Sequence, residues 1–262
     1  MATTQALWTR SQQLIALRLY MRLPFGRLHG KNPEIIELAK HIGRTPGALA
    51  MKACNFASLD PAFRASNRAG LSGASNADRA LWDEFSSDAE KFAAEAEEAV
   101  AAFDLESTKS KLDEFQPPIG ETDTSRLVRV RRVQSFFRAA VLTSYESRCA
   151  ITGLATTELL VASHIIPWSV AVARRADPRN GICLSALFDR AFDRGLMTFD
   201  KSFCVVISEY LLRDAKTADL PCSINDAHGR KIRLPNRFSP DEAALEHHRT
   251  ITFVDSRIGQ PS

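Results

Sequence analysis

The segment 148–199 constrains the fold of this 262-residue chain more than any other. Its apolar run up to His164 predicts a strand that ends before the proline three residues later, because proline has no amide hydrogen for a sheet. The sequence Asp-Pro-Arg-Asn-Gly, which contains Asn180, predicts a turn. Residues 184–194 predict a helix that ends at Gly195. We therefore expect a strand, a turn and a helix, with polar side chains on all three.

The polar residues of this segment suit the hydrolysis of a phosphodiester bond. This reaction needs a base that deprotonates water and a cation that takes up charge on the phosphate and the leaving oxygen. A neutral imidazole, such as that of His164, serves as the base near neutral pH. Asp189 and Asp193 offer the hard oxygen ligands that Mg²⁺ or Mn²⁺ prefers, and their spacing of four residues places both carboxylates on one helix face.

The segment resembles the catalytic core of the HNH nucleases, which have the ββα-metal fold. The resemblance covers about a fifth of the chain and rests on four motifs in order, namely Cys-Ala-Ile-Thr-Gly, Ala-Ser-His-Ile-Ile-Pro-Trp, Pro-Arg-Asn-Gly-Ile and Phe-Asp-Arg-Ala-Phe-Asp-Arg-Gly. It implies that His164 is the general base, and that Asn180 ties the loop together and helps to hold that base. It also implies that Asp189 and Asp193, with Ser163, hold one divalent metal ion, Mg²⁺ or Mn²⁺.

By this resemblance, the chain is expected to be a bacterial restriction-type endonuclease that hydrolyses phosphodiester bonds of double-stranded DNA. Restriction of foreign DNA is the expected cellular role, and a base modification is one feature that such a nuclease can recognise. Arg194 and Arg190 are expected to contact phosphate. One site per chain can cut both strands only in a dimer or by two sequential nicks, and we expect a homodimer.

Two departures from the family pattern leave alternatives open. The helix carries no histidine, and alignment on residues 192–195 puts either Phe188 or Asp189 where relatives carry one. Asp189 would keep a metal ligand at that position, whereas Phe188 would remove one. Ser163 stands where relatives often have Asp or His, and a hydroxyl is a weak ligand. The alternatives to an active DNA nuclease are a catalytically degenerate DNA-binding protein or regulator, and a nuclease toxin or RNase.

Each of these residues, taken alone, also has an ordinary structural explanation. A histidine at the end of an apolar strand is commonly half-buried, and Asn-Gly is a common turn. Two aspartates at helical spacing are commonly a solvated face, here with Arg190 and Arg194 as ion-pair partners. The joint order and spacing of the motifs, rather than any single residue, favours the nuclease interpretation.

Charge divides the chain into three parts. Residues 1–77 carry 10 Lys/Arg and 3 Asp/Glu, a net charge of +7, whereas residues 78–125 carry 4 and 14, a net charge of −10. Residues 126–262 carry 20 and 14, a net charge of +6. This distribution predicts two nucleic-acid-facing modules joined by an acidic helix and linker over residues 78–125. The third part is the expected nuclease domain, so the predicted fold class is α+β.

Residues 1–77 show the pattern of a helix-turn-helix or winged-helix-like DNA-binding module. Asn32 and the proline after it predict the start of a helix that ends at Gly43, and a Thr-Pro pair opens a second helix. The second helix is expected to enter the major groove, and residues 67–76 are a candidate wing or a connector. The alternative is an ordinary helix pair in a bundle. The candidate DNA-contacting residues are Arg44, Thr45, Lys52 and Asn55.

The rest of the chain predicts further elements and a compartment. We expect one long helix over 78–103, a Pro-Pro linker over 107–125, a basic helix over 134–145, strands over 203–208 and 231–234, and a final helix over 240–249. Five scattered cysteines without a Cys-x-x-Cys pair indicate free thiols and no structural zinc. Because the chain also lacks an 18-residue apolar stretch, we expect a cytoplasmic protein that does not contact a membrane.

Overall fold

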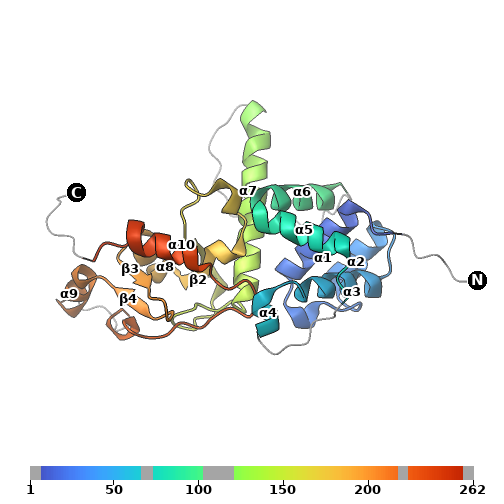
Figure 1. Ribbon diagram of the computed structural model, residues 1–262. Coiled ribbons are helices and arrows are strands. Elements are labelled where there is room, and N and C mark those ends of the chain that lie inside the picture. Colours follow the sequence, from blue (N-terminus) through green and yellow to red (C-terminus); the bar gives the residue numbers. More distant parts are fainter. Residues whose placement is uncertain (1–6, 66–72, 103–120, 218–223, 256–262) are drawn as a thin grey trace, which may run out of the picture. The chain divides into compact units, whose positions relative to one another are not determined.

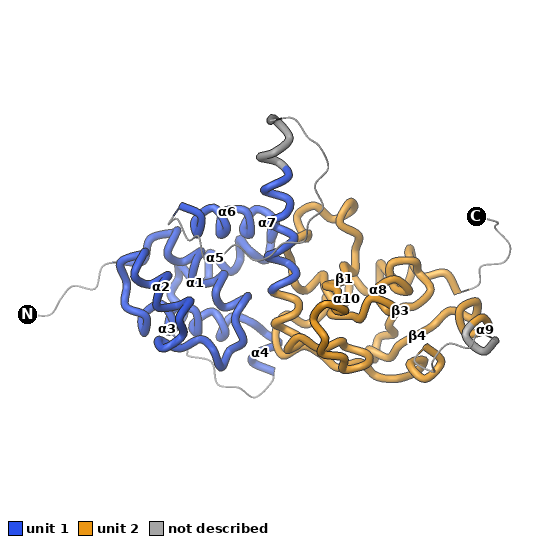
Figure 2. Tube along the Cα trace, turned by 180° about the vertical axis from the view of Figure 1, so that it is seen from behind, with its two compact units in different colours: residues 1–139 blue, residues 140–262 orange. Residues whose placement is uncertain are grey.

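The computed structural model describes residues 7–65, 73–102, 121–217 and 224–255. It combines helices with small antiparallel sheets, which agrees with the predicted α+β class (Figure 1). The chain forms two compact units, residues 1–139 and 140–262 (Figure 2). Among the described residues, no helix combines the length and the apolar character that a membrane span requires.

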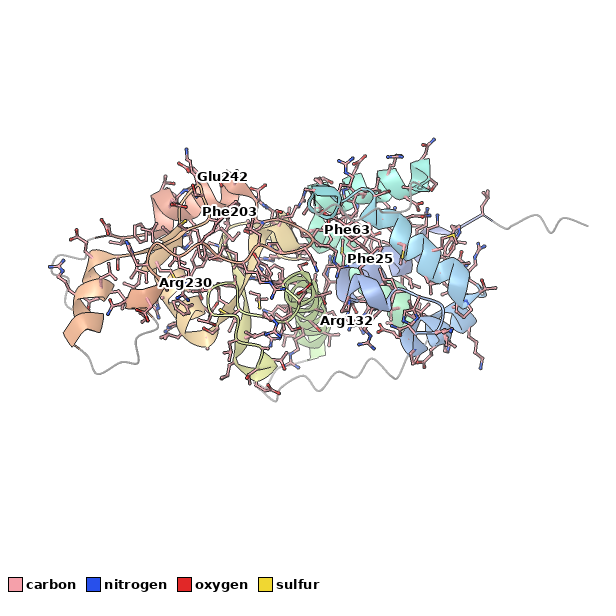
Figure 3. The ribbon with its side chains drawn as sticks, turned by 90° about the horizontal axis from the view of Figure 1, so that it is seen from below. Phe25, Phe63, Arg132, Phe203, Arg230 and Glu242 are labelled. Atoms are coloured by element: carbon pink, nitrogen blue, oxygen red, sulfur yellow. The ribbon has the colours of Figure 1, made fainter. Side chains whose placement is uncertain are left out.

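The first unit is a bundle of helices built around α1, Arg10–Arg22. Every residue from 13 to 21 is buried, so α1 packs on several sides, principally against α3 and α6. Phe25 of a short 3₁₀ turn packs on Phe63 with ring centroids 4.7 Å apart (Figure 3). The unit also contains α2 (Pro33–His41), α3 (Pro46–Ala57), α4 (Pro61–Ala65), α5 (Asn76–Ser87), α6 (Ala89–Ala101) and the first part of α7 (Glu121–Ser144).

The helix pair α2 and α3 begins where the sequence predicts. The Asn32 side chain accepts a hydrogen bond from the amide of Glu34, and the Thr45 side chain accepts one from Ala48, so both helices are capped. Gly43 between them has a φ of +66°, a conformation that glycine adopts at low cost. The pair packs within the bundle around α1, and its reading as a DNA-binding module stays a prediction. Part of the candidate wing, residues 66–72, lies outside the described residues.

The single long helix expected over 78–103 is wrong, because α5 and α6 meet at Asp88. Asp88 ends α5, and its carboxylate accepts a hydrogen bond from the Lys91 amide at 3.0 Å, which starts α6. Serine and aspartate side chains compete with backbone hydrogen bonds, so the Ser-Ser-Asp run favours a cap over a continuous helix. Phe85 and Phe92 pack edge to face across the break, with centroids 5.5 Å apart.

The predicted basic helix is longer than expected, because α7 runs over Glu121–Ser144. The linker predicted over 107–125 therefore ends earlier, because residues 121–125 are helical. Residues 103–120 lie outside the described residues. The boundary between the two compact units falls inside α7, between residues 139 and 140. Phe136 of α7 packs on Phe92 of α6 with ring centroids 6.0 Å apart. The division of the chain into a DNA-binding module (1–77), an acidic helix and linker (78–125) and a nuclease domain (126–262) stays a prediction.

The second unit contains two small antiparallel sheets. Strand β1 (Leu160–His164) pairs with β2 (Gly181–Ser185), which leads directly into helix α8 (Ala186–Asp193). Strand β3 (Met197–Phe199) pairs with β4 (Val205–Ile207), as predicted for that part of the chain. The strand expected over 231–234 is wrong, since that segment makes only an isolated bridge from Lys231 to Cys204. The helices α9 (Glu209–Thr217) and α10 (Glu242–His247) complete the unit.

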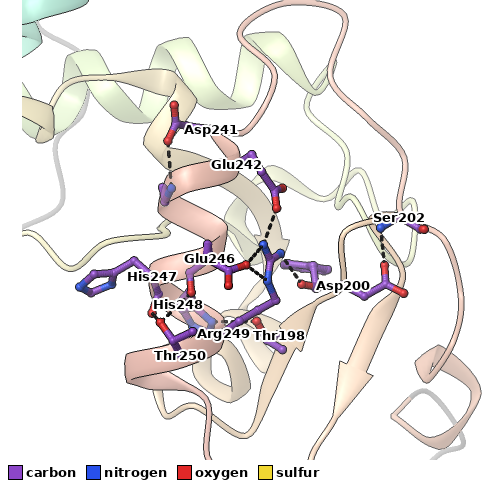
Figure 4. Close-up of polar contacts among 12 residues, drawn as sticks. Thr198, Asp200, Ser202, Asp241, Glu242, Glu246, His247, His248, Arg249 and Thr250 are labelled. Carbon is purple, nitrogen blue, oxygen red and sulfur yellow. Dashed lines mark hydrogen bonds and ion pairs between the residues drawn. The ribbon is translucent and has the colours of Figure 1, made fainter.

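The segment that follows α10 is held against the second sheet and α8 by polar contacts, of which those of His248 are buried (Figure 4). His248 bonds to the Thr198 hydroxyl at 3.0 Å and to the Phe192 carbonyl at 3.1 Å, and its ring stacks on that of Phe192. Arg249 donates to the Phe199 carbonyl at 3.0 Å and pairs with Glu246 at 2.6 Å. These contacts fasten the C-terminal part of the unit to α8 and β3.

Candidate active site

The strand–turn–helix arrangement predicted for residues 160–194 brings the candidate residues together. In the pairing of β1 with β2, His164 lies opposite Gly181, the residue after Asn180. Helix α8 packs on both strands and carries Asp189 and Asp193. Beside β1 and α8 lies a cavity of about 450 Å³, which is lined by six of the predicted residues, Ser163, His164, Asp189, Arg190, Asp193 and Arg194.

His164 is half-buried and has its tautomer set by a backbone carbonyl. Its Nε2 lies 3.0 Å from the carbonyl oxygen of Arg175, which can only accept, so Nε2 carries the proton and Nδ1 carries the lone pair. Burial lowers the pKa of His164, and the Arg175 carbonyl opposes this in part. The imidazole is therefore neutral at neutral pH, which is the form that a general base requires.

Asn180 braces the turn that follows His164. Its side-chain oxygen accepts from the Ile166 amide at 2.9 Å, and its side-chain nitrogen donates to the Ile166 carbonyl at 3.1 Å. Its own carbonyl accepts from the Ile165 amide at 2.9 Å. Asn180 is 1% exposed, so these three bonds are shielded from water. The geometry is that of the expected brace, and the importance of Asn180 for activity stays a prediction.

The two aspartates of α8 lie in an environment that disfavours their charged forms. Partial burial raises the pKa of Asp189. Partial burial and the neighbouring charge of Asp189 raise the pKa of Asp193, while Arg190 and Arg194 oppose these effects. Two carboxylates that repel each other at the wall of one cavity are stabilised when a cation binds between them.

Ser163 adds a third oxygen to this wall. Its hydroxyl is buried and makes no hydrogen bond of normal geometry with the described residues, although it lies near enough to Asp189 to lower the pKa of that carboxyl. Buried hydroxyls are nearly always hydrogen-bonded, so an unsatisfied one beside two carboxylates indicates a missing partner. These three residues fit one oxygen-coordinated cation. Within the described residues, however, no cluster of three or more His, Cys, Asp and Glu side chains forms a complete metal site.

The structure distinguishes the two candidates for the altered helix position. Phe188 is 2% exposed and belongs to the core, whereas Asp189, one residue later, lines the cavity. Phe188 points about 100° away from Asp189 around the helix axis and is not among the residues that line the cavity. The carboxylate is therefore the side chain that reaches the site.

The residues expected to contact DNA in the first unit already have partners within it. Lys52 is 8% exposed and forms an ion pair with the fully buried Asp78 at 3.0 Å, so its charge is already paired within the unit, and its DNA contact also stays a prediction. Arg44 donates to the Leu7 carbonyl at 2.6 Å. Thr45 caps α3, and Asn55 donates to the Gly73 carbonyl at 3.2 Å. A DNA-binding role for Arg44, Thr45 and Asn55 stays a prediction.

Two residues at the site were missed by sequence reasoning. Trp168 lines the cavity and lies edge-on to the His164 ring, with centroids 5.6 Å apart. Arg175 supplies the carbonyl that binds His164. Trp168 stood within a quoted motif without an assigned role, and no local pattern predicts a contact between residues eleven positions apart.

Comparison with known proteins supports the same segment. The family model described as HNH endonuclease matches residues 149–200, which include β1, the Asn180 turn, β2 and α8. No curated protein matches the chain. The match indicates nuclease activity on nucleic acid, and it spans His164, Asn180, Asp189 and Asp193. Residues 149–200 of this chain are therefore similar to the HNH endonuclease family.

Proposed function

We propose that the chain is a metal-dependent endonuclease that hydrolyses phosphodiester bonds of double-stranded DNA. The observation that carries this proposal is the position of His164, Asp189 and Asp193 around one cavity, within the segment that matches the HNH endonuclease family. A base and two carboxylates in one cavity are the groups that metal-assisted hydrolysis of a phosphodiester requires.

His164 is the proposed general base. With its proton on Nε2, the imidazole accepts a proton from the attacking water at Nδ1, and the hydroxide formed attacks the phosphorus atom. The Arg175 carbonyl then faces an imidazolium, whose positive charge strengthens the hydrogen bond from Nε2. Asn180 keeps the turn after β1 in place, so that the imidazole does not shift as the charge develops.

Asp189 and Asp193, with Ser163, are the proposed ligands of one Mg²⁺ or Mn²⁺ ion. When bound, this ion supplies positive charge that stabilises the pentacovalent phosphate and the leaving 3′ oxygen. The raised pKa values of the two aspartates and the unsatisfied Ser163 hydroxyl support this assignment. Arg194 and Arg190, which line the same cavity, are proposed to contact the phosphate.

Restriction of foreign DNA is the proposed cellular role. The net charge of +7 on residues 1–77 supports a DNA-binding role for the first unit, which we propose as the part that recognises a sequence or a base modification. A homodimer would supply the second site that cleavage of both strands needs. The free thiols of Cys54, Cys149, Cys183 and Cys204 fit the reducing cytoplasm.

Plasmid cleavage tests this proposal. Methylated and unmethylated supercoiled plasmids are incubated with the wild type, with His164→Ala, and with His41→Ala as a control at an exposed histidine, in EDTA, Mg²⁺ or Mn²⁺. We expect cleavage only with metal, a loss of roughly 10²- to 10⁴-fold in His164→Ala, and wild-type activity in His41→Ala.

Two outcomes would contradict the proposal. Intact DNA binding without cleavage under any metal would indicate a degenerate, binding-only protein. Cleavage of RNA in preference to both plasmids would indicate a ribonuclease or toxin. A difference between methylated and unmethylated plasmid would identify modification as a feature that the protein recognises.

A further inference from the structure

We propose that Trp168 and Arg175 are positioning residues that hold the imidazole of His164 in one tautomer and one orientation. The proposal rests on the function proposed above for His164 as the base. Its physical basis is a closed set of contacts in the segment between β1 and the Asn180 turn, which we call the Trp168–Arg175 clamp.

The clamp consists of four contacts among three residues. The Nε2 of His164 donates to the Arg175 carbonyl at 3.0 Å, and the Nε of Arg175 donates to the Trp168 carbonyl at 2.8 Å. The Arg175 guanidinium lies over the Trp168 ring, 5.0 Å from its centre. The Trp168 ring in turn meets the His164 ring edge to face, with an interplanar angle of 88°. Trp168 and Arg175 both touch the imidazole, and they are also bonded to each other.

The bonds between Trp168 and Arg175 matter because the Arg175 carbonyl lies in a loop. A carbonyl can fix the orientation of a histidine only if its loop is itself held in place. Arg175 is eleven residues from His164, and the chain between them forms only turns and a 3₁₀ segment, Val172–Arg174. The Arg175 side chain ties that loop back to Trp168 through a hydrogen bond and a cation–π contact. The Trp168 ring restricts rotation of the imidazole about its Cβ–Cγ bond.

The far side of the loop is also anchored. Arg174 lies 3.5 Å from Asp177 and 3.3 Å from Asp241. Asp177 caps the short 3₁₀ segment Pro178–Asn180, which ends at the brace. The clamp and the Asn180 brace thus hold His164 from two directions, one at the imidazole and one at the backbone after β1.

A kinetic test separates positioning from a purely structural role. We would compare Trp168→Leu and Arg175→Gln with the conservative Trp168→Phe, which keeps an aromatic edge, and with Val170→Ala at an exposed position of the same loop. Single-turnover cleavage and DNA affinity are measured for each. We expect the cleavage rate constant to fall roughly 10- to 100-fold in the first two variants. DNA affinity should stay within about twofold, and Trp168→Phe and Val170→Ala should stay near the wild type.

A second readout does not depend on cleavage. Nitrogen NMR of ¹⁵N-labelled imidazoles, recorded in EDTA with His164→Ala to assign the signal, reports which ring nitrogen carries the proton. We expect a single Nε2-protonated form in the wild type and a mixture of tautomers in Trp168→Leu and Arg175→Gln. Thermal unfolding near that of the wild type would show that both variants are folded.

The outcomes separate this proposal from the proposed function. If the wild type holds one tautomer, the variants lose it and no DNA is cut under any metal, the clamp stands and the nuclease proposal fails. If His164→Ala abolishes cleavage but both clamp variants keep the wild-type rate and tautomer, the nuclease proposal stands and the clamp fails. If Trp168→Leu weakens DNA affinity without changing the rate constant, Trp168 is a substrate contact and the positioning role is refuted.

Discussion

Replacing Lys52 by methionine is expected to destabilise the first unit without weakening its affinity for DNA. The Nζ of Lys52 lies 3.0 and 3.1 Å from the two carboxylate oxygens of Asp78, which is fully buried. Burial raises the pKa of Asp78, but hydrogen bonds from the Ser75 backbone and from Lys52 outweigh it, so the pKa lies below its usual value. Asp78 is therefore charged at neutral pH, and Lys52 is its neutralising partner.

The magnitude follows from the remaining partners of the carboxylate. Removing one member of a buried ion pair costs about 3 to 5 kcal/mol, because the other charge stays buried. Asp78 would still accept from the Ser75 amide at 2.9 Å and from Gln13 at 3.2 Å, which places the expected loss at the lower end, about 3 kcal/mol. With a urea dependence of about 1 to 3 kcal/mol per M, the unfolding midpoint should fall by roughly 1 to 3 M.

Urea unfolding followed by tryptophan fluorescence measures this change, since Trp8 and Trp82 lie in the first unit. The control is Lys40→Met, because Lys40 is exposed on α2 and should change the stability by less than about 0.5 kcal/mol. The double variant Lys52→Met/Asp78→Asn no longer buries an unpaired charge and should be more stable than Lys52→Met by at least about 1 kcal/mol.

DNA affinity, measured below the unfolding transition, distinguishes the buried ion pair from the DNA contact that the sequence predicted. A structural Lys52 leaves the affinity of Lys52→Met equal to that of Lys40→Met. The reasoning would be refuted if both variants were equally stable and Lys52→Met alone lost affinity, because Lys52 would then reach DNA instead of Asp78.

Three further predictions concern the second unit. Burial holds the pKa of His248 at about 4 in the folded state, against about 6.5 when unfolded, so the unfolded chain takes up a proton first. Stability should fall by about 3 kcal/mol as the pH drops from about 6.5 to 4, and urea titrations of His248→Asn should lack this slope. Gly195 has a φ of +65°, and an added Cβ would lie 2.0 Å from the Thr252 carbonyl oxygen. Gly195→Ala should therefore cost more than about 3 kcal/mol, whereas Gly153→Ala, with a φ of +75° and open space, should cost about 1 kcal/mol by the same assay. Asn180→Ala removes the partners of the partly buried Ile166 amide and carbonyl, so we expect a loss of about 2 kcal/mol in thermal unfolding and a slower cleavage rate; unchanged stability would contradict the brace.

Much of the ββα segment could be predicted because its signals are local. A proline after His164 ends β1, the Asp-Pro-Arg-Asn-Gly sequence makes the turn, and Gly195 takes the left-handed conformation that ends α8. Each signal acts within about four residues, through backbone sterics and short-range hydrogen bonds. The same is true of the caps at Asn32 and Thr45, which placed the starts of α2 and α3.

The sequence by itself determined the strand, turn and helix of residues 160–194, six of the residues that line the cavity, and the resemblance of residues 149–200 to the HNH endonucleases. Only the tertiary structure decided that Asp189 rather than Phe188 faces the cavity, that Lys52 is buried on Asp78, and that the Arg175 carbonyl sets the tautomer of His164. The physical reason is the distance along the chain over which each effect acts. Backbone preferences are set by neighbours in the chain, whereas burial, charge pairing and the partner of a ring nitrogen depend on segments that meet only when the chain packs.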